Sequence, residues 1–586
     1  MLSVRPVETV SMVTRDGVRL DADVYRPEGE GTFPVLLMRQ PYGKAIASTV
    51  VYAHPTWYAA CGYIVVIQDV RGRGTSEGQF KLFTHEIDDG FDTVNWAANL
   101  PGSNGNVGMY GFSYQGMTQL YAAAGKPAAL KTICPAMIAY DLYSDWAYEG
   151  GAFCLQTNFG WAIQLAAETA RLNEDIAAYQ LLYTASQSLP FYEPVPNLIA
   201  SLRKYSPNNF YYEWLAHPEQ DEYWEELSPK RHLQNVDLPM LHIGGWFDTY
   251  LRGTINLYKE MAAKSALTQQ IKIGPWAHLP WGRKVGAVDY GAEAESLVDR
   301  GQIRWFDQFL KGLNTGLLDE PPVSLFEMGS NQWRDFDKWP SNNQKSYFLA
   351  TTGLASVRQD QGTLEPRQQS TDLVVETRQS LGDLVPRLEP GNESGEVEPP
   401  QVQDIIDNPK SKIQNSFDIF VHDPWRPVPS QGGHAAIPAG SFDRSSIDCR
   451  TDVLTYTCEP LKEDLHVAGD VAVEVFCTVD TPSFDLCAVL SEVRPDGSVY
   501  NFTQGYLRVD QKKPGFCRIP LQATCVRIAK DNALRLSLSA ACFPAYAVNC
   551  GTGTSAGEAR LMDAQIITIT VSCGGDFPSQ VLLPAV

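Results

Sequence analysis

The chain has 586 residues, of which 44% are hydrophobic and 20% are charged. This length predicts two or three domains rather than one, and this apolar content excludes disordered and fibrous proteins. The formal net charge of −21 argues against nucleic acid and anionic membrane surfaces as partners, because both bind basic surfaces.

The sequence predicts a soluble, cytoplasmic protein. Its N-terminal segment lacks the apolar run of a signal peptide, and no stretch reaches the roughly 20 apolar residues that span a bilayer. Nine of the twelve cysteines lie from Cys449 to Cys573, in strand-like runs typical of buried free thiols. Disulfides in an exported protein remain the alternative, and the sequence leaves a homodimer open.

Short apolar runs alternate with helical patterns in the first third of the chain. The apolar runs expected to form buried strands are Val35–Met38, Tyr63–Val70, Asn106–Tyr110 and Leu130–Cys134. The segments expected to form helices are Ser48–Ala60, Asp89–Ala98 and Gly116–Ala124. Such alternation predicts a mostly parallel sheet with helices on both faces.

The pattern changes at about residue 140. Residues 140–233 are rich in aromatic side chains and helical in period, and buried-strand patterns return at Pro239–Trp246 and Gln270–Trp276. A helical segment inserted between two strands of one sheet has the layout of a cap over a site. The helical spacing of Leu297–Gly312 closes this region.

The remainder of the chain is expected to be all-β. Many short strands separated by turns, such as Pro495-Asp496-Gly497, suggest a sandwich or jelly roll. Within it, the polar segment Arg358–Lys412 is interpreted as a long surface excursion or linker. The predicted organisation is a catalytic domain (1–139 and 234–318), a helical cap (140–233) and a β domain (319–586).

One short motif carries the strongest chemical signal. In Gly111-Phe112-Ser113-Tyr114-Gln115-Gly116, a strand runs into the first glycine and a helix begins near Gln115. A serine on such a turn projects its hydroxyl above the sheet edge, as in the nucleophile elbow G-x-S-x-G. The second glycine comes one residue late here, so an ordinary turn serine remains the alternative.

A nucleophilic serine needs a base, and the base needs an acid that orients it. His278 and Asp248 each follow a predicted buried strand, and they occur in the chain order Ser, Asp, His. His242 lies inside a predicted strand and is better explained as a core histidine. The backbone N–H of Tyr114 and the phenol of Tyr42 are the expected donors to an oxyanion.

The sequence supports neither a nucleotide-binding loop nor a metal site. The glycine-rich segment Asp69–Gly78 lacks both the third glycine of a dinucleotide loop and the ending of a P-loop, which favours a structural turn. There is no His-Glu-x-x-His motif and no cluster of cysteine and histidine, so neither a metal nor a cofactor is expected.

The chain resembles the cocaine esterase/glutaryl acylase family of serine hydrolases, which is related to X-prolyl dipeptidyl peptidases and α-amino acid ester hydrolases. The resemblance covers nearly the whole length. In the catalytic part it rests on Arg39–Tyr42, Asp69–Gly74, Asp89–Thr93, Gly111–Gly116, Gly245–Asp248 and Gly274–His278. Further along it rests on Trp305–Asp307, Met328-Gly329, Trp333-Arg334, Trp339-Pro340, Asp423-Pro424, Pro427–Pro429, Gly432-Gly433 and Arg450–Asp452.

This resemblance implies an α/β-hydrolase fold with an inserted helical cap and a C-terminal jelly roll. It also implies that Ser113 is the nucleophile, His278 the general base and Asp248 its orienting acid, with Tyr42 and Tyr114 forming the oxyanion hole. The expected reaction is hydrolysis of a small-molecule ester or amide through an acyl-enzyme. The alternatives are an X-prolyl dipeptidyl peptidase, an α-amino acid ester hydrolase or acylase, and a non-catalytic binding protein.

The acyl group is expected to meet an apolar pocket. Its candidate walls are Trp146, Phe153, Trp161 and Tyr250, for which plain packing is the alternative. A peptidase or amino ester hydrolase would also need a carboxylate to hold a free ammonium group. Asp145 and Glu149 are available in the cap, although surface exposure is the expectation for both.

Overall fold

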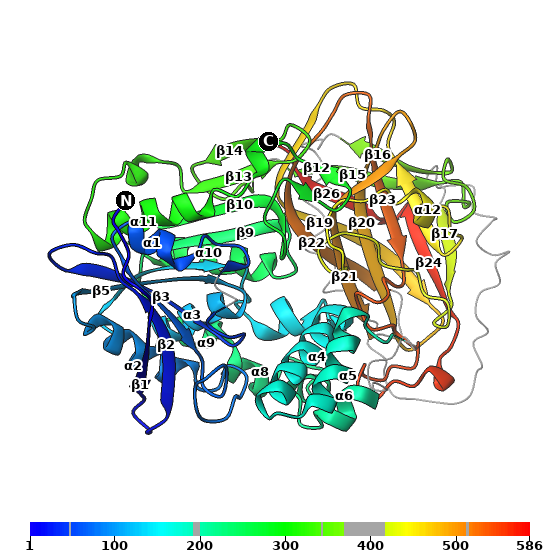
Figure 1. Ribbon diagram of the computed structural model, residues 1–586. Helices are drawn as coiled ribbons and strands as arrows, with labels where there is room; N and C mark the ends of the chain where they lie inside the picture. Colours follow the sequence, from blue (N-terminus) through cyan, green and yellow to red (C-terminus); the bar gives the residue numbers. More distant parts are fainter. Residues whose placement is uncertain (46–48, 192–199, 342–343, 368–415, 511–514) are drawn as a thin grey trace, which may run out of the picture.

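The computed structural model describes residues 1–45, 49–191, 200–341, 344–367, 416–510 and 515–586. Two large sheets dominate it: the first is built from the N-terminal part of the chain and the second from the C-terminal part (Figure 1). Over the described ranges, no helix is both long enough and apolar enough to cross a membrane.

The N-terminal sheet has ten strands in the order β1-β2-β4-β3-β5-β6-β9-β10-β13-β14. Their bounds are Glu8–Val13 (β1), Arg19–Tyr25 (β2), Phe33–Gln40 (β3), Ile64–Asp69 (β4), Ser103–Phe112 (β5), Leu130–Ala136 (β6), Met240–Phe247 (β9), Gln269–Ala277 (β10), Val323–Glu327 (β13) and Gln332–Phe336 (β14). The strands from β4 to β13 run parallel, while β1, β2 and β14 form antiparallel edges. The predicted buried strands are therefore its centre.

Helices cover both faces of this sheet because its central strands are apolar on both sides. In β3, Val35 and Leu37 pack with α2 (Glu86–Ala98) and α3 (Tyr114–Ala124). Leu36 and Met38 point to the opposite face of the sheet. There they belong to a hydrophobic cluster that includes residues of α1 (Pro55–Ala60) and α11 (Val298–Leu310). Helix α10 (Leu251–Lys264) follows β9.

The helix predicted from Ser48 begins later than expected, at Pro55. Residues 46–48 lie outside the described part, and a proline at the first helical position with His54 as its cap sets the start.

In the described part of the chain between β6 and β9 there are six helices, in agreement with the helical pattern expected for residues 140–233. They are α4 (Leu155–Leu172), α5 (Ile176–Gln187), α6 (Ala200–Tyr205), α7 (Phe210–Ala216), α8 (Glu222–Leu227) and α9 (Pro229–His232). Before them come a π-helical turn, η2 (Tyr143–Ala147), and a small hairpin of β7 (Tyr148–Glu149) and β8 (Ala152–Phe153). Sequence periodicity gave no sign of these short strands, because two residues are too few to alternate.

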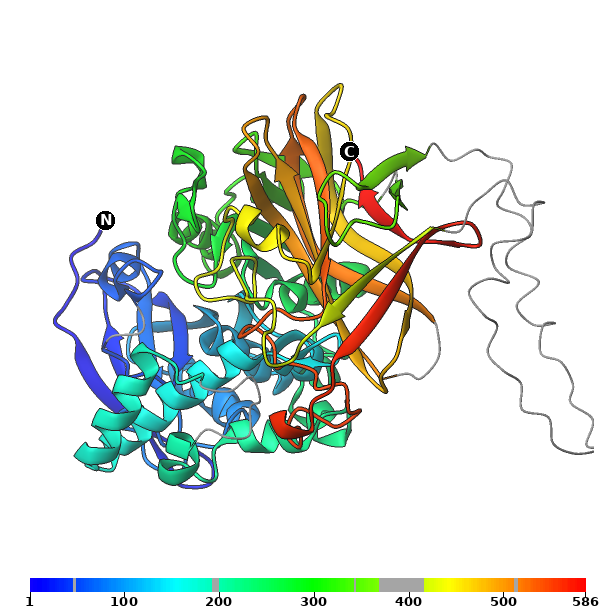
Figure 2. The same ribbon diagram turned by 90° about the vertical axis from the view of Figure 1, so that its right-hand side faces the viewer.

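In its described residues the C-terminal domain is all-β apart from short helical turns such as α12 (Ser445–Asp448), and its long strands can be followed in Figure 2. Its strands are β15 (Gln344–Thr351), β16 (Gly362–Arg367), β17 (Phe417–His422), β18 (Val453–Thr457), β19 (Leu465–Val479), β20 (Phe484–Val493), β21 (Val499–Val509), β22 (Gly515–Ile528), β23 (Ala533–Ser539), β24 (Ile567–Gly574), β25 (Phe577–Pro578) and β26 (Gln580–Pro584). Their pairing is antiparallel except between β16 and β18.

The predicted polar excursion at 358–412 is wrong at its start, because residues 362–367 form strand β16 against β15. Residues 368–412 of that segment lie outside the described part. The twelve cysteines are free, and of the nine from Cys449 to Cys573 all but the exposed Cys449 are buried.

Candidate active site

Ser113 lies on the tight turn between β5 and α3. Its backbone has φ 59° and ψ −128°, a strained region for a residue with a side chain. The Ser113 N–H donates to Ala136 O on β6 at 2.9 Å, and Ser113 O accepts from Met117 N at 2.9 Å. The serine is thus held firmly at the carboxyl end of a central parallel strand.

The two glycines of the motif are needed for close packing. A Cβ on Gly111, where φ is +140°, would lie 2.5 Å from Gln115 Cβ. A Cβ on Gly116 would lie 2.3 Å from Ile138 Cγ2 and 2.8 Å from Ala136 O. The late second glycine therefore serves the same purpose as in the usual elbow, since it lets the helix approach the neighbouring strand.

Asp248 and His278 are hydrogen-bonded to each other at the same sheet edge. Asp248 follows β9 and His278 follows β10, and His278 Nδ1 lies 2.7 Å from Asp248 Oδ1. Asp248 is fully buried. Its main chain is also held by the C-terminal domain, because Gln522 Nε2 on β22 donates to the carbonyl oxygen of Asp248 at 3.0 Å.

The imidazole of His278 reaches the end of β5. Its ring centroid lies 5.4 Å from that of Phe112, the residue before Ser113, and 5.0 Å from that of Tyr250. Because Nδ1 is bound to Asp248, the remaining nitrogen, Nε2, is available to a reacting group. His242, in contrast, is buried inside β9, where Nε2 meets Gln269 Oε1 at 3.1 Å.

Tyr42 lies just beyond β3, at the edge where Ser113 lies. Its N–H donates to Gln40 Oε1 at 2.8 Å, and its phenol oxygen accepts from Trp161 Nε1 at 3.1 Å. Burial raises the pKa of Tyr42 to about 12, so the phenol keeps its proton at neutral pH. Tyr114 is the first residue of α3 and has no helical acceptor for its N–H.

Three of the four predicted pocket residues form one aromatic cluster with Tyr42 and His278. The ring of Trp146 lies 4.2 Å from that of Tyr250 and 5.0 Å from that of Trp161. Phe153, the fourth, is buried, and its described ring contacts are with Tyr148 at 5.2 Å and with Tyr211 on α7 at 5.5 Å.

Phe83 is a member of this cluster that sequence reasoning missed. It stacks on Tyr114 with centroids 4.8 Å apart and approaches Trp146 at 5.7 Å and Trp161 at 6.5 Å. Its φ of 58° is unusual for an aromatic residue. Nothing in the local sequence signals that conformation, because contacts from distant segments impose it.

Asp145 and Glu149 are both buried, contrary to the expectation of surface exposure. Arg252 lies 3.6 Å from Asp145 Oδ1 and 3.4 Å from Glu149 Oε1. Glu149 Oε2 also meets His434 Nε2 at 2.8 Å and accepts from Tyr546 Oη at 2.6 Å. Burial acts to raise the pKa of Glu149, but His434 and Arg252 outweigh it and lower the pKa below its ordinary value.

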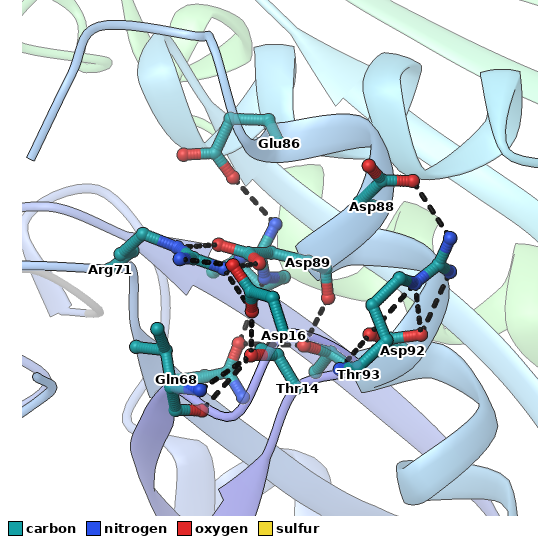
Figure 3. A network of polar contacts seen from close by, with 12 residues as sticks. Thr14, Asp16, Gln68, Arg71, Glu86, Asp88, Asp89, Asp92 and Thr93 are labelled. Atoms are coloured by element: carbon teal, nitrogen blue, oxygen red, sulfur yellow. Dashed lines mark hydrogen bonds and ion pairs between the residues drawn. The ribbon is translucent and has the colours of Figure 1, made fainter. Parts of the chain in front are cut away.

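A polar network behind the elbow anchors the side chain of Tyr114. Tyr114 Oη donates to Glu86 Oε1 at 2.8 Å, and Glu86 Oε2 meets Arg39 Nη1 at 2.6 Å. Glu86 starts the acidic first turn of α2, whose Asp89 binds Arg71 at 2.6 Å (Figure 3). The aromatic ring is thereby fixed while its backbone N–H remains at the helix start.

The glycine-rich loop after β4 is closed by its own aspartate. Asp69 Oδ1 accepts from the N–H of Lys44 at 2.7 Å, and Asp69 Oδ2 accepts from that of Thr75 at 3.2 Å. A Cβ on Gly74 would overlap the Asp69 carboxylate. The loop is a structural turn, as predicted.

Two family models cover most of the chain. The model described as X-Pro dipeptidyl-peptidase (S15 family) matches residues 16–280, and the X-Pro dipeptidyl-peptidase C-terminal non-catalytic domain matches residues 315–582. A cocaine esterase from Rhodococcus sp. (strain MB1 Bresler) is 28% identical and aligns over 98% of each chain.

Two solved structures have the same fold. One is an aminopeptidase from a marine sediment archaeon, Thaumarchaeota archaeon, with TM-score 0.77 and 22% identity. The other is an α-amino acid ester hydrolase, with TM-score 0.73 and 21% identity; each alignment covers 99% of this chain and 96% of the other. The two matched family models and the cocaine esterase relative show that the chain is a hydrolytic enzyme and belongs to the serine hydrolase family that includes cocaine esterase and the X-Pro dipeptidyl peptidases.

Proposed function

We propose that the enzyme hydrolyses carboxylic esters of small, apolar acyl groups, with Ser113 as nucleophile, His278 as general base and Asp248 as the acid that orients it. The 2.7 Å pair between Asp248 and His278, at the sheet edge where Ser113 is held at φ 59° and the His278 ring meets Phe112, is the observation that carries this proposal. A strained serine next to an oriented imidazole is the arrangement needed for acyl transfer.

Acylation begins when Ser113 Oγ attacks the ester carbonyl carbon. Nε2 of His278 takes the serine proton, while Asp248 holds Nδ1 and stabilises the imidazolium that forms. The carbonyl oxygen becomes negative and accepts hydrogen bonds from Tyr42 Oη and the Tyr114 N–H. Tyr42 can donate because its oxygen accepts from Trp161, which leaves its own proton free.

The tetrahedral intermediate collapses when the bond to the leaving alcohol breaks. His278 gives its proton to the departing oxygen, and the acyl group remains on Ser113. Water then repeats the sequence: His278 takes a proton from the water, whose oxygen attacks the acyl carbon, and returns it to Ser113 as the acid leaves.

The positions of the proposed catalytic residues also support a division of the chain into three parts. We assign 1–139 and 234–318 to an α/β-hydrolase domain, 140–233 to a helical cap and 319–586 to a jelly roll. The parallel strands with the serine, aspartate and histidine after β5, β9 and β10 support the first of these. The contact of Trp161, on α4, with Tyr42 supports a cap above the site.

Trp146, Trp161 and Tyr250 are proposed to form the wall of the acyl pocket. All three rings connect to Tyr42 or His278 through contacts of 5.0 Å or less. We leave Phe153 out of the pocket, because its described ring contacts are with Tyr148 and Tyr211 and not with the cluster around Tyr42 and His278.

The buried carboxylates favour a plain ester over a substrate with a free α-amino group. Asp145 and Glu149 would be the anions for an ammonium group, but both carboxylates meet Arg252, and Glu149 is also bound by His434. An ammonium group would have to compete with these partners for the two carboxylates, and breaking a buried pair is costly.

A pair of substrates tests this preference. We expect p-nitrophenyl phenylacetate to be hydrolysed with kcat/KM at least equal to that of the matching ester with an α-amino group. A preference of about 100-fold or more for the amino ester would contradict the proposal and favour an amino ester hydrolase or aminopeptidase. An active Ser113→Ala variant would overturn the serine mechanism itself.

A further inference from the structure

Arg73 is a buried cation without a carboxylate partner. It is 3% exposed, and within the described ranges no Asp or Glu oxygen lies within 4.0 Å of its side-chain nitrogens. The other buried arginines each have one: Arg39 with Glu86, Arg71 with Asp89, Arg444 with Asp448 and Arg535 with Asp448. Buried charges are normally paired, because an unpaired buried charge loses its hydration free energy and gains no compensating interaction with an opposite charge.

The contacts that hold Arg73 are neutral. Nη1 donates to Thr169 Oγ1 at 3.1 Å and to Leu165 O at 3.4 Å, and the guanidinium lies 3.9 Å from the ring centroid of Phe80. Its Nε is buried and has no hydrogen-bond partner among the described residues. Glu168, on the same helix, pairs instead with Arg171 at 2.7 Å.

Helix α4 connects Arg73 to the proposed oxyanion hole. Trp161, Leu165 and Thr169 are spaced four residues apart and so lie on one face of α4. The first of this row donates to the Tyr42 phenol, and the other two accept from Arg73. The guanidinium therefore lies along the same face of α4 as Tyr42.

The charge of Arg73 acts on the pKa of Tyr42, in agreement with this geometry. Burial raises the pKa of Tyr42, while the Trp161 hydrogen bond and the charge of Arg73 act to lower it. Burial lowers the pKa of Arg73 to about 10, which keeps it a cation at neutral pH; Tyr114, Glu168 and Tyr42 are the groups that act against this fall.

We propose that Arg73 is a positioning residue of the oxyanion hole, whose unneutralised charge makes Tyr42 a stronger hydrogen-bond donor to the developing oxyanion. This inference rests on the proposed function of Tyr42. A cation acts strongly through a water-poor interior, because its field is weakly screened there. Arg71, two residues earlier, cannot do the same, since Asp16 and Asp89 neutralise it (Figure 3).

A substitution that removes the Arg73 charge should not lower the stability of the fold. If Arg73 is retained for catalysis, its loss removes a buried unpaired charge, and the apparent unfolding temperature should stay level or rise. If Arg73 were structural, the same substitution should lower that temperature. Thermal unfolding thus separates the two roles independently of activity.

The test is a double-mutant cycle with a p-nitrophenyl ester. We expect Arg73→Met to lower kcat about 10- to 100-fold with KM changed less than about 3-fold, and Arg73→Lys to recover most of that loss. Tyr42→Phe alone should lower kcat about 100-fold. In the Tyr42→Phe background, Arg73→Met should cost less than about 3-fold, because the donor on which it acts is gone.

Arg71→Met is the matched control from the same loop. It leaves Asp16 and Asp89 without their cation, so we expect a lower unfolding temperature but no Tyr42-dependent loss of kcat. Should Arg73→Met fail to fold, Arg73→Gln, which can still bond Thr169, takes its place in the cycle.

Full activity in Arg73→Met, or an equal loss in both backgrounds, would overturn the proposal. A loss that Arg73→Lys does not recover would also overturn it. Failure of the proposed serine mechanism gives a different result: the wild-type enzyme would neither hydrolyse esters nor react with a fluorophosphonate. That result would contradict both the proposed function and the role of Arg73.

Discussion

The indole N–H of Trp161 donates to the phenol oxygen of Tyr42 across 3.1 Å. This bond joins α4 of the helical segment to the loop after β3, two elements separated by more than a hundred residues. Because the phenol oxygen accepts this bond, the Tyr42 proton is not used in it and can be donated to another group. Through this bond the helical segment holds the side chain that we propose as an oxyanion donor.

Trp161→Phe should lower kcat on p-nitrophenyl esters about 10-fold. The substitution keeps an aromatic ring in the cluster but removes the N–H that fixes and polarises Tyr42. Trp146→Phe is the matched control, because the Trp146 indole nitrogen has no hydrogen-bond partner in the part of the chain that the structure describes. Equal effects of the two substitutions on kcat would show that ring size, not the hydrogen bond, matters.

Asp248→Asn should lower kcat about 10⁴-fold while KM changes little. The amide can present an N–H where the carboxylate accepts from His278 Nδ1, which favours the wrong tautomer of the imidazole. Steady-state kinetics with thermal unfolding of the same samples checks this. A loss of less than about 10-fold in a folded variant would be incompatible with Asp248 as the orienting acid.

His242 should make the protein less stable in mild acid. Burial lowers the pKa of His242 to about 4, whereas an unfolded histidine titrates near 6.5. The unfolded state thus takes up a proton first, and the stabilisation present above pH 6.5 is lost as the pH falls toward 4. Integration gives roughly 2 kcal/mol between pH 7 and pH 5.

Urea unfolding of wild type and His242→Gln at pH 7 and pH 5 measures that difference. We expect the variant to lose about 2 kcal/mol less than wild type between the two pH values. The depressed pKa of Glu149 does not interfere, since its linkage operates below about pH 4.3. Equal losses in both proteins would mean that His242 is protonated alike in the folded and unfolded states.

Much of this architecture follows from local sequence. Alternating apolar and helical segments predict the central strands, and the positions of Ser113, Asp248 and His278 after β5, β9 and β10 follow from where those strands end. Parallel strands bring their carboxyl ends to one edge, so chain order and strand ends suffice to gather these three residues.

Side-chain burial in the helical segment could not be predicted in the same way. Buried Glu149 is hydrogen-bonded by His434 and Tyr546, and these partners lie 285 and 397 residues further along the chain. Gln522 holds the main chain of Asp248 from 274 residues away. No local pattern encodes such contacts, because they exist only after the C-terminal domain packs against the catalytic part.

Short elements were missed for a related reason. Strand β16, at residues 362–367, has a polar sequence and owes its conformation to pairing with β15, not to an apolar pattern of its own. Arg73 is the clearest example of a feature that local sequence cannot predict. Its motif predicts a turn, but only the structure reveals that its charge is buried and lacks a carboxylate partner within the described ranges.

The most direct test of the central claim is the reaction of the intact protein with a small fluorophosphonate, followed by intact-mass and peptide mapping, with Ser113→Ala alongside. The account predicts one adduct per chain, on Ser113, and none on the variant. Absence of an adduct on folded wild-type protein, or an equal adduct on Ser113→Ala, would contradict the assignment of Ser113 as an activated nucleophile.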